Sequence, residues 1–126
     1  MWLKRLSILA VFLACGVVAL GAYTRLADAG LGCPDWPGCY GHLTVPKHPE
    51  DIERANSAYP HRPVESHKAW PEMIHRYFAS SLGLVILVML YLSFRARRSN
   101  PATPIKLPLA LAALVIFQGL LGMWTV

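Results

Sequence analysis

Three long uncharged stretches, separated by polar segments, dominate the pattern of the chain. No charged residue lies in residues 6–24, 77–94 or 107–126. A helix needs about 20 largely apolar residues to cross the roughly 30 Å hydrocarbon layer of a bilayer, and it satisfies its own backbone hydrogen bonds there. The pattern therefore predicts an all-α membrane protein with transmembrane helices over these three ranges.

The composition supports lipid, rather than water, as the surroundings of much of the chain. Hydrophobic residues make up 55% of the 126 positions and charged residues only 15%, whereas soluble domains usually carry about 25% charged residues. The net charge is +5, but the 12 Lys and Arg do not gather on one polar face, as a nucleic-acid-binding surface requires. We expect one membrane domain over residues 1–126, with the lipid bilayer and no nucleic acid as its partner.

The first uncharged stretch also has features of a secretory signal peptide. Lys4 and Arg5 form a basic start, and Ala19-Leu20-Gly21 resembles a small-residue cleavage site. The apolar stretch is longer than the roughly 7–15 residues usual for a signal peptide. This length favours an anchored helix over a cleaved leader.

Basic residues are denser on one side of the predicted membrane. The N-terminal tip and residues 95–106 together hold six Lys and Arg, whereas the longer segment 25–76 holds another six with all seven acids. By the positive-inside rule, the N-terminus and the inner loop 95–106 are cytoplasmic, and the outer loop 25–76 is extracytoplasmic. No leader rich in Arg and Ser starts the chain, which favours the bacterial inner membrane over a mitochondrion. Pro101, Pro104 and Pro108 are expected to keep the inner loop from continuing as helix.

The outer loop contains two cysteines close together. Two prolines and a glycine lie between Cys33 and Cys39, and such residues form turns that bring chain segments back together. In an oxidising compartment these thiols are expected to form a disulfide. A zinc site with His42 and His48 is an alternative, although it lacks the closely spaced cysteine pair of structural sites. The bridge itself is either structural or redox-active.

A Glu-x-x-His pattern stands at the outer end of the second predicted span. Glu72 and His75 are three residues apart, so they share one helix face, and the small residues Ala79 and Gly83 follow at one-turn intervals. Small residues leave a hollow in which a flat macrocycle fits, and histidine is the usual axial ligand of haem in helical bundles. The alternative is a plain helix start, since Pro71 suits a first turn and a glutamate suits the positive end of the helix dipole.

Two further polar residues belong to this picture. Arg76 follows the histidine and is suited to bind either a haem propionate or lipid head groups. Gln118, with Gly119 and Gly122, lies about 18 Å into the third span at about 1.5 Å per residue. This depth places it in the outer half of the bilayer, as expected for His75.

Three separated motifs resemble the N-terminal part of the haem A synthase family. They are Thr24-Arg25-Leu26 followed by Gly30-Leu31-Gly32-Cys33-Pro34-Asp35-Trp36-Pro37-Gly38-Cys39-Tyr40-Gly41, then Glu72-x-x-His75-Arg76, then Gln118-Gly119-x-x-Gly122 ending in Thr125-Val126. The resemblance runs from residue 23 to the end. It implies an eight-helix membrane oxidoreductase, built from two four-helix bundles, that oxidises the C8 methyl of haem O to the formyl group of haem A for cytochrome oxidase.

The resemblance also implies roles for individual residues. His75 would be an axial ligand of the haem iron and Glu72 the catalytic acid at the edge of the substrate haem. Arg76 would belong to the haem-binding residues, and Cys33 and Cys39 would match the family's disulfide. The implied cofactor is haem b, with haem O as the substrate.

The chain departs from the family in its extent. The family's second histidine ligand of this bundle comes from a fourth helix, whereas this sequence ends with its third span. We therefore expect three helices of an incomplete four-helix haem-binding bundle, inactive alone. Candidate partners are haem O synthase, cytochrome oxidase assembly factors and a second copy of the chain. The alternative functions are a non-catalytic haem-binding or assembly subunit and a quinone-coupled thiol–disulfide membrane protein.

Overall fold

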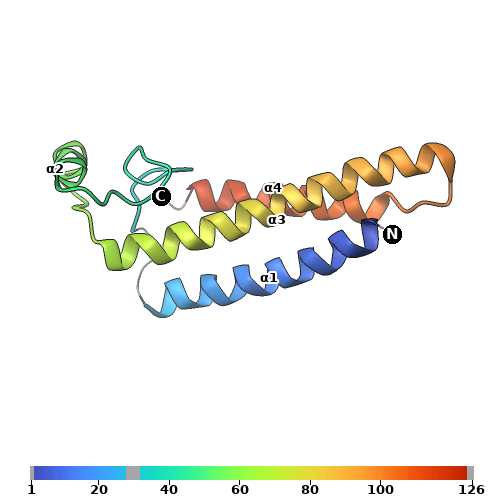
Figure 1. Cartoon of the computed structure of the whole chain (residues 1–126), viewed down its shortest axis with the longest axis horizontal. Coiled ribbons are helices and arrows are strands. Elements are labelled where there is room, and N and C mark those ends of the chain that lie inside the picture. The colour runs from blue at the N-terminus through green and yellow to red at the C-terminus, as the bar shows by residue number, and fades with distance from the viewer. Residues whose placement is uncertain (1, 28–31, 125–126) are drawn as a thin grey trace.

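The protein is a set of long helices with a folded segment at one end (Figure 1). The computed structural model describes residues 2–27 and 32–124. Within them the helices are α1 (Trp2–Leu26), α2 (Pro49–Ala58), α3 (Ser66–Ser99) and α4 (Lys106–Trp124), and no strand occurs beyond an isolated bridge between Cys39 and His42. Helices α1, α3 and α4 are each long and apolar enough to cross a membrane. The predicted all-α membrane fold is confirmed.

The helices are longer than the uncharged stretches from which they were predicted. Helix α3 has 34 residues, which is about 51 Å at about 1.5 Å per residue and well over the thickness of the hydrocarbon layer. Residues 66–76, assigned from the sequence to the outer loop, are therefore helical, and so are residues 95–99 of the inner loop. The charge pattern marks where a helix leaves the apolar layer and not where the helix ends.

Two prolines have other positions within their helices than the sequence predicted. Pro71 is the sixth residue of α3 rather than part of its first turn, so the explanation of Glu72 by the helix dipole is wrong. The helix starts earlier because Ala69 and Met73 on it are buried in a tertiary core, and such packing decides helix extent more than local preference does. Pro108 lies in the first turn of α4, where a missing N–H costs no intrahelical bond, so it does not interrupt the helix.

Helix α2 is an element that the sequence reading of the outer loop missed. It begins with Pro49 at its first position, and Glu50 and Asp51 follow in the first turn. Proline is preorganised for this position, and the two carboxylates interact favourably with the positive end of the helix dipole. These residues were a usable local signal.

Helix α3 is the centre of the bundle. It packs against both α1 and α4, whereas α1 and α4 do not pack on each other within the described part of the chain. Close approach depends on small residues: a Cβ added at Gly16 would lie 3.0 Å from the Phe78 ring, and one at Gly83 would lie 3.3 Å from Val115 Cγ1. Space therefore remains beside α3, between α1 and α4.

The water-excluding core lies at one end of the molecule, between the outer loop and the first turns of α3. It consists of the buried residues Cys33, Cys39, Tyr40, Val45, Ala55, Ala69 and Met73. We call residues 32–76, which contain this core, the cap, and we call residues 2–26, 77–99 and 106–124 the bundle. Helix α1 has no buried residue, and many large apolar side chains of the bundle are exposed, as expected for a surface that lipid covers.

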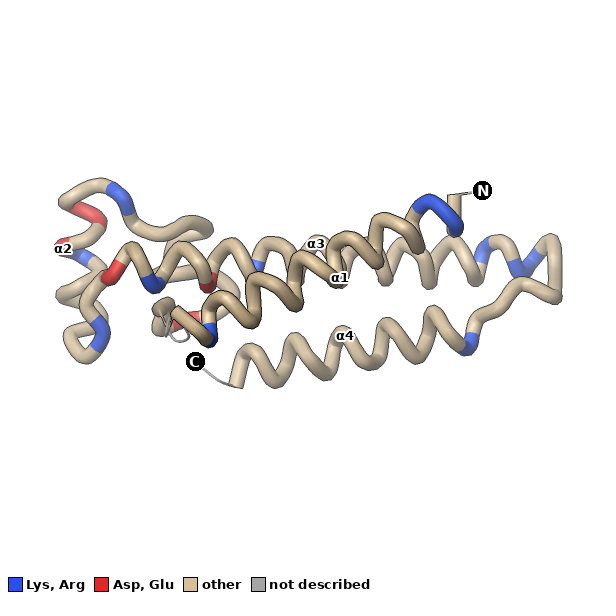
Figure 2. The backbone as a smooth tube through the Cα atoms, turned by 90° about the horizontal axis from the view of Figure 1, so that it is seen from below, with Lys and Arg blue, Asp and Glu red and all other residues tan. Residues whose placement is uncertain are grey.

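The two ends of the molecule differ in charge. Basic residues without acidic neighbours lie around the N-terminus and the α3–α4 connection, whereas the acidic residues of the described part of the chain lie at the opposite end, in the cap, among further Lys and Arg (Figure 2). This is the distribution from which the membrane orientation was predicted, and the orientation itself stays a prediction.

Candidate functional site

A disulfide joins Cys33 to Cys39, as predicted. Both residues are completely buried, which shields the sulfurs from attack by an outside thiolate. The bridge also removes the two sulfur ligands of the zinc alternative, and no cluster of three metal-ligating side chains occurs among residues 2–27 and 32–124. The burial favours a structural bridge.

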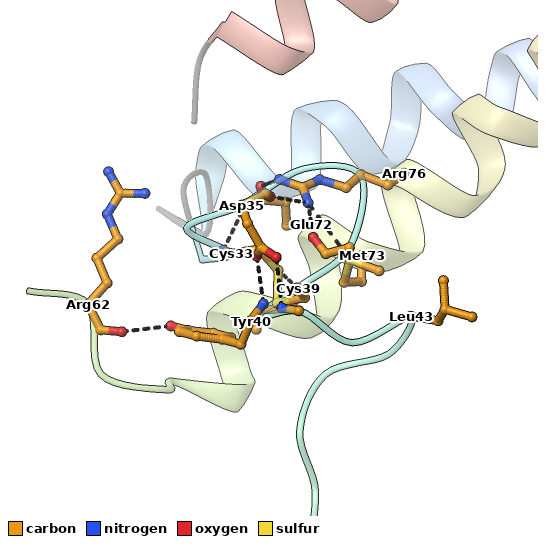
Figure 3. Close-up of a disulfide and its surroundings, with 12 residues drawn as sticks. Cys33, Asp35, Cys39, Tyr40, Leu43, Arg62, Glu72, Met73 and Arg76 are labelled. Carbon is orange, nitrogen blue, oxygen red and sulfur yellow. Dashed lines mark hydrogen bonds and ion pairs between the residues drawn. A yellow bond between two sulfur atoms is a disulfide. The ribbon is translucent and has the colours of Figure 1, made fainter. Parts of the chain in front are cut away.

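The ring closed by this disulfide packs directly on the backbone of α3. A Cβ added at Gly32 would lie 2.6 Å from the Lys68 carbonyl, so only glycine allows this close approach. The next residue, Cys33, donates its N–H to Glu72 Oε2 at 3.1 Å (Figure 3). The carboxylate predicted as catalytic thus also anchors the ring.

Arg76 makes the second attachment between α3 and the ring. Its Nη1 donates to the carbonyl oxygens of Asp35 at 2.8 Å and Gly38 at 2.6 Å, and its Nη2 pairs with Glu72 Oε1 (Figure 3). The Arg76 and Glu72 side chains are only 11% and 12% exposed. The ion pair is therefore largely buried, and both charged groups have further hydrogen bonds. A buried ion pair needs such bonds to offset the cost of removing its charges from water.

The remaining part of the ring is held by its own polar groups. Asp35 accepts the N–H groups of Tyr40 at 2.6 Å and Gly41 at 2.7 Å, two residues with φ of 52° and 77°. The Tyr40 hydroxyl donates to the Arg62 carbonyl at 2.9 Å. Burial raises the pKa of Tyr40, which keeps this donor protonated. Contacts from several sides therefore hold the ring and the two residues after it.

A cavity of about 810 Å³ lies beside α3, under the ring. Its volume is in the range of about 300–1,000 Å³ typical of small-molecule and cofactor sites. The lining residues are Val17, Val18, Gly21 and Thr24 of α1, Trp36 of the ring, Glu72, His75, Arg76, Ala79, Ser80, Leu82 and Gly83 of α3, and Val115, Gln118, Gly119 and Gly122 of α4. The structure thus brings together the predicted site residues, the predicted small-residue face and the glutamine of the third span.

His75 is half-buried on the wall of this cavity. A Cβ added at Gly21 of α1 would lie 3.3 Å from His75 Nε2, so the glycine leaves room for the imidazole. The sequence reading treated Gly21 only as part of a cleavage-like triplet and missed this contact. A small residue on a neighbouring span was the available signal.

The residues around the cavity fit a flat, largely apolar ligand such as a haem. The wall offers one imidazole, and no atom lies within 4 Å of a Cβ built at Gly119, so open space faces that part of α4. Arg76 binds the ring carbonyls through Nη1 and Glu72 through Nη2. The remaining N–H groups of its guanidinium are suited to bind an anion. Binding of a propionate by Arg76 and ligation of iron by His75 stay predictions.

Parts of two motifs lie outside the described residues. Gly30 and Leu31 precede the ring, and Thr125 and Val126 end the third motif and the third predicted span.

Comparison with known proteins gives a consistent relationship. The family model COX15-CtaA, described as "Cytochrome oxidase assembly protein", matches residues 4–126. The chain is 50% identical over 125 residues to "Heme A synthase" of Shewanella oneidensis, a match that covers 99% of this chain and 36% of that protein. It is 30% identical over 132 residues to "Heme A synthase" of Sinorhizobium fredii, covering 92% and 34% respectively.

A more distant relative shows the same partial coverage. The "Heme A synthase-mitochondrial ferredoxin fusion protein" of Schizosaccharomyces pombe is 28% identical over 129 residues, which is 90% of this chain and 20% of that protein. The chain spans about a third of the length of the bacterial relatives it matches. No solved structure gives a significant match.

Proposed function

The chain belongs to the COX15-CtaA family of cytochrome oxidase assembly proteins, and from this premise we propose that it acts in haem A biosynthesis as the N-terminal haem-binding part of a membrane oxidoreductase. The proposed reaction converts haem O to haem A by oxidation of the C8 methyl to a formyl group, in which an acceptor outside this chain takes up the electrons and water or dioxygen supplies the oxygen atom. The similarity to relatives named Heme A synthase supports this reaction.

The observation that carries the proposal is the position of His75 on the cavity wall. Its imidazole faces α1 across Gly21, in a cavity large enough for a cofactor. A neutral imidazole nitrogen is the usual protein ligand of haem iron in helical bundles. We assign His75 as the residue that would hold the iron of haem b.

Glu72 and Arg76 have proposed roles at the same wall. Bound haem b supplies the iron-centred redox chemistry. The Glu72 carboxylate lines the cavity and is held in place by Cys33 and Arg76, so it is oriented without having to reorganise. We assign to it the stabilisation of positive charge that develops at the methyl carbon under oxidation. We assign to the free part of the Arg76 guanidinium a propionate contact.

The proposed location is the bacterial inner membrane with the N-terminus in the cytoplasm. The basic end of the bundle supports this orientation by the positive-inside rule, and it places the cap and the cavity on the extracytoplasmic side. Haem O is the proposed substrate, and haem O synthase, assembly factors of cytochrome oxidase and a second copy of the chain are proposed partners.

A chimera tests the proposal. The 126 residues replace the matching part of the Shewanella oneidensis enzyme, and haem A is measured by chromatography of extracted haem from cells without their own Heme A synthase. We expect haem A from the chimera, and none after His75→Ala. The matched control is His67→Ala, because His67 lies on the same helix but is 76% exposed. Equal haem A from the His75→Ala chimera would contradict the proposal.

A second variant separates catalysis from binding. Glu72→Gln keeps the size of the side chain and its ability to accept a hydrogen bond, but removes the negative charge. We expect the chimera with this substitution to retain its Soret absorbance and to lose haem A formation. If the unsubstituted chimera binds haem and forms no haem A, the chain is a non-catalytic haem-binding subunit instead.

A further inference from the structure

Trp36 differs from its neighbours in the disulfide ring. The indole is 44% exposed, although the cysteines that close the ring are completely buried. Among the described residues that line the cavity, Trp36 is the one that does not come from α1, α3 or α4. A large apolar side chain that protein leaves partly uncovered on a cavity wall is typical of a surface that a ligand covers.

The backbone on both sides of Trp36 is clamped to α3. Arg76 Nη1 donates to the carbonyl of Asp35, immediately before the tryptophan, and to that of Gly38, two residues after it. Both bonds are charge-assisted, which makes them stronger than neutral ones, and the arginine is largely shielded from water. The disulfide closes the same segment covalently. The indole is therefore held at the cavity from a fixed backbone.

We propose that Trp36 is the cap-side wall of the cavity that contacts the macrocycle of a bound tetrapyrrole, and that Arg76 is the positioning residue that holds it there. An indole offers a flat apolar surface that suits stacked or edge contacts with another aromatic system. The inference rests on the proposed function only in that both need a tetrapyrrole in this cavity. It assigns Arg76 a task apart from its propionate contact.

Lipid is the competing explanation for an exposed tryptophan at this level. Tryptophan is enriched where a membrane protein passes the head groups. Trp124, the last described residue of α4, provides the matched comparison, because it is 72% exposed and does not line the cavity. The C-terminal end of α4 lies toward the cap end of the molecule (Figure 1). A role in lipid contact predicts similar behaviour of the two tryptophans, and a role in ligand contact does not.

The test measures binding of metal-free protoporphyrin IX to the full chain in nanodiscs by fluorescence anisotropy of the porphyrin. We expect Trp36→Ala to weaken this binding roughly three- to tenfold, the factor expected for loss of an aromatic contact. Trp36→Phe retains a flat ring and should keep most of the affinity. Trp124→Ala should change nothing, because Trp124 does not line the cavity.

Arg76→Lys tests the positioning role through non-additivity. Lysine keeps the charge, but its single nitrogen cannot bind the two ring carbonyls from one position and Glu72 from a second, as Nη1 and Nη2 of Arg76 do, so we expect weaker porphyrin binding. If Arg76 acts partly through the indole, the double variant Trp36→Ala/Arg76→Lys loses less affinity than the two single losses together, because only the propionate contact is left to weaken. A general structural role of Arg76 would instead make the two effects add. An intact disulfide, checked by mass spectrometry without reductant, verifies the fold of each variant.

Three results would overturn the inference: no porphyrin binding by the unsubstituted chain, unchanged binding by Trp36→Ala, or an equal loss in Trp124→Ala. Failure of the proposed function is a separate observation. A chimera that forms no haem A, beside a chain whose porphyrin affinity depends on Trp36, would reject the oxidoreductase and keep the contact. Haem A formation by the chimera, beside a porphyrin affinity that does not depend on Trp36, would keep the oxidoreductase and reject the Trp36 contact.

Discussion

The cap and the bundle are stabilised by different means. The cap has a buried core, a disulfide and a shielded ion pair, and its contacts join positions far apart in the sequence. The bundle has few buried side chains and brings its helices together at glycines. Water exclusion stabilises the first region, whereas close packing within lipid stabilises the second.

The cavity lies where these two regions meet, and α3 belongs to both. Glu72 and Arg76 point into the contacts that hold the cap, while His75, between them in sequence, faces α1 of the bundle. Neighbouring residues of one motif therefore serve different regions. Substitutions in this motif should separate into those that loosen the cap and those that alter the bundle face.

Removal of the Arg76 side chain should have the largest effect on the cap. Arg76→Ala leaves the Glu72 carboxylate buried without its partner and frees two ring carbonyls. Breaking a buried pair from one side costs about 3–5 kcal/mol. We expect faster hydrogen exchange throughout residues 32–76, measured by mass spectrometry in nanodiscs, and unchanged exchange in α4. Arg97→Ala, an exposed arginine in the last turn of the same helix, should leave both regions unchanged.

Removal of the disulfide should have the next largest effect. Cys33→Ser with Cys39→Ser opens a short ring, and the chain-entropy account gives a loss of about 2 kcal/mol for a loop of this size. Limited proteolysis should cut the cap sooner while the helical content of the bundle, measured by circular dichroism, stays the same. Cys15→Ser is the control, because Cys15 is free and exposed on α1. Equal loss of helix in both regions would show that cap and bundle unfold as one unit.

The sequence predicted the bundle better than the cap for a physical reason. A membrane span needs only an uncharged stretch of sufficient length, which is local information. Likewise, three-residue spacing places Glu72 and His75 together whenever the segment is helical. The turn residues between Cys33 and Cys39 were sufficient to expect the bridge that the structure contains.

The contacts between cap and helix were not predictable from local pattern. Arg76 donates to the backbone carbonyls of Asp35 and Gly38, which precede it by 41 and 38 positions. Every residue has a backbone carbonyl, so the sequence does not indicate which ones will be bound. Gly32 looked like an ordinary loop glycine until it proved to lie against the backbone at Lys68. The early start of α3 has the same origin, since the packing of Ala69 and Met73 determines it.

The Tyr40 hydroxyl gives the cap a pH dependence. Burial raises the pKa of Tyr40 above its ordinary value of 10.0, so its contribution is fully present below about pH 10 and is lost as the pH rises through the folded-state pKa. Tyr40→Phe removes the hydrogen bond to Arg62, at a cost of about 1 kcal/mol, and this pH dependence with it. The measurement is protease sensitivity of the cap between pH 8 and pH 11, in steps of about half a unit, with a protease active over that range. Identical curves for both proteins would exclude this hydroxyl as the titrating group.

The smallest expected effect on stability, and the most selective one on the site, is that of Gly21→Ala. The added Cβ would lie 3.3 Å from His75 Nε2, so the imidazole has to shift by a few tenths of an ångström. Alanine favours the helix by up to about 1 kcal/mol, which offsets the strain in stability. We expect a shifted Soret band in the haem-loaded chain with unchanged hydrogen exchange in the cap.

Gly16→Ala is the control on the same helix, because its Cβ would press on the Phe78 ring at 3.0 Å and not on His75. It should loosen the packing of α1 on α3 without moving the Soret band. If both variants shift the band equally, the imidazole responds to the bundle as a whole, and the division of α3 between its cap contacts and its bundle face is wrong.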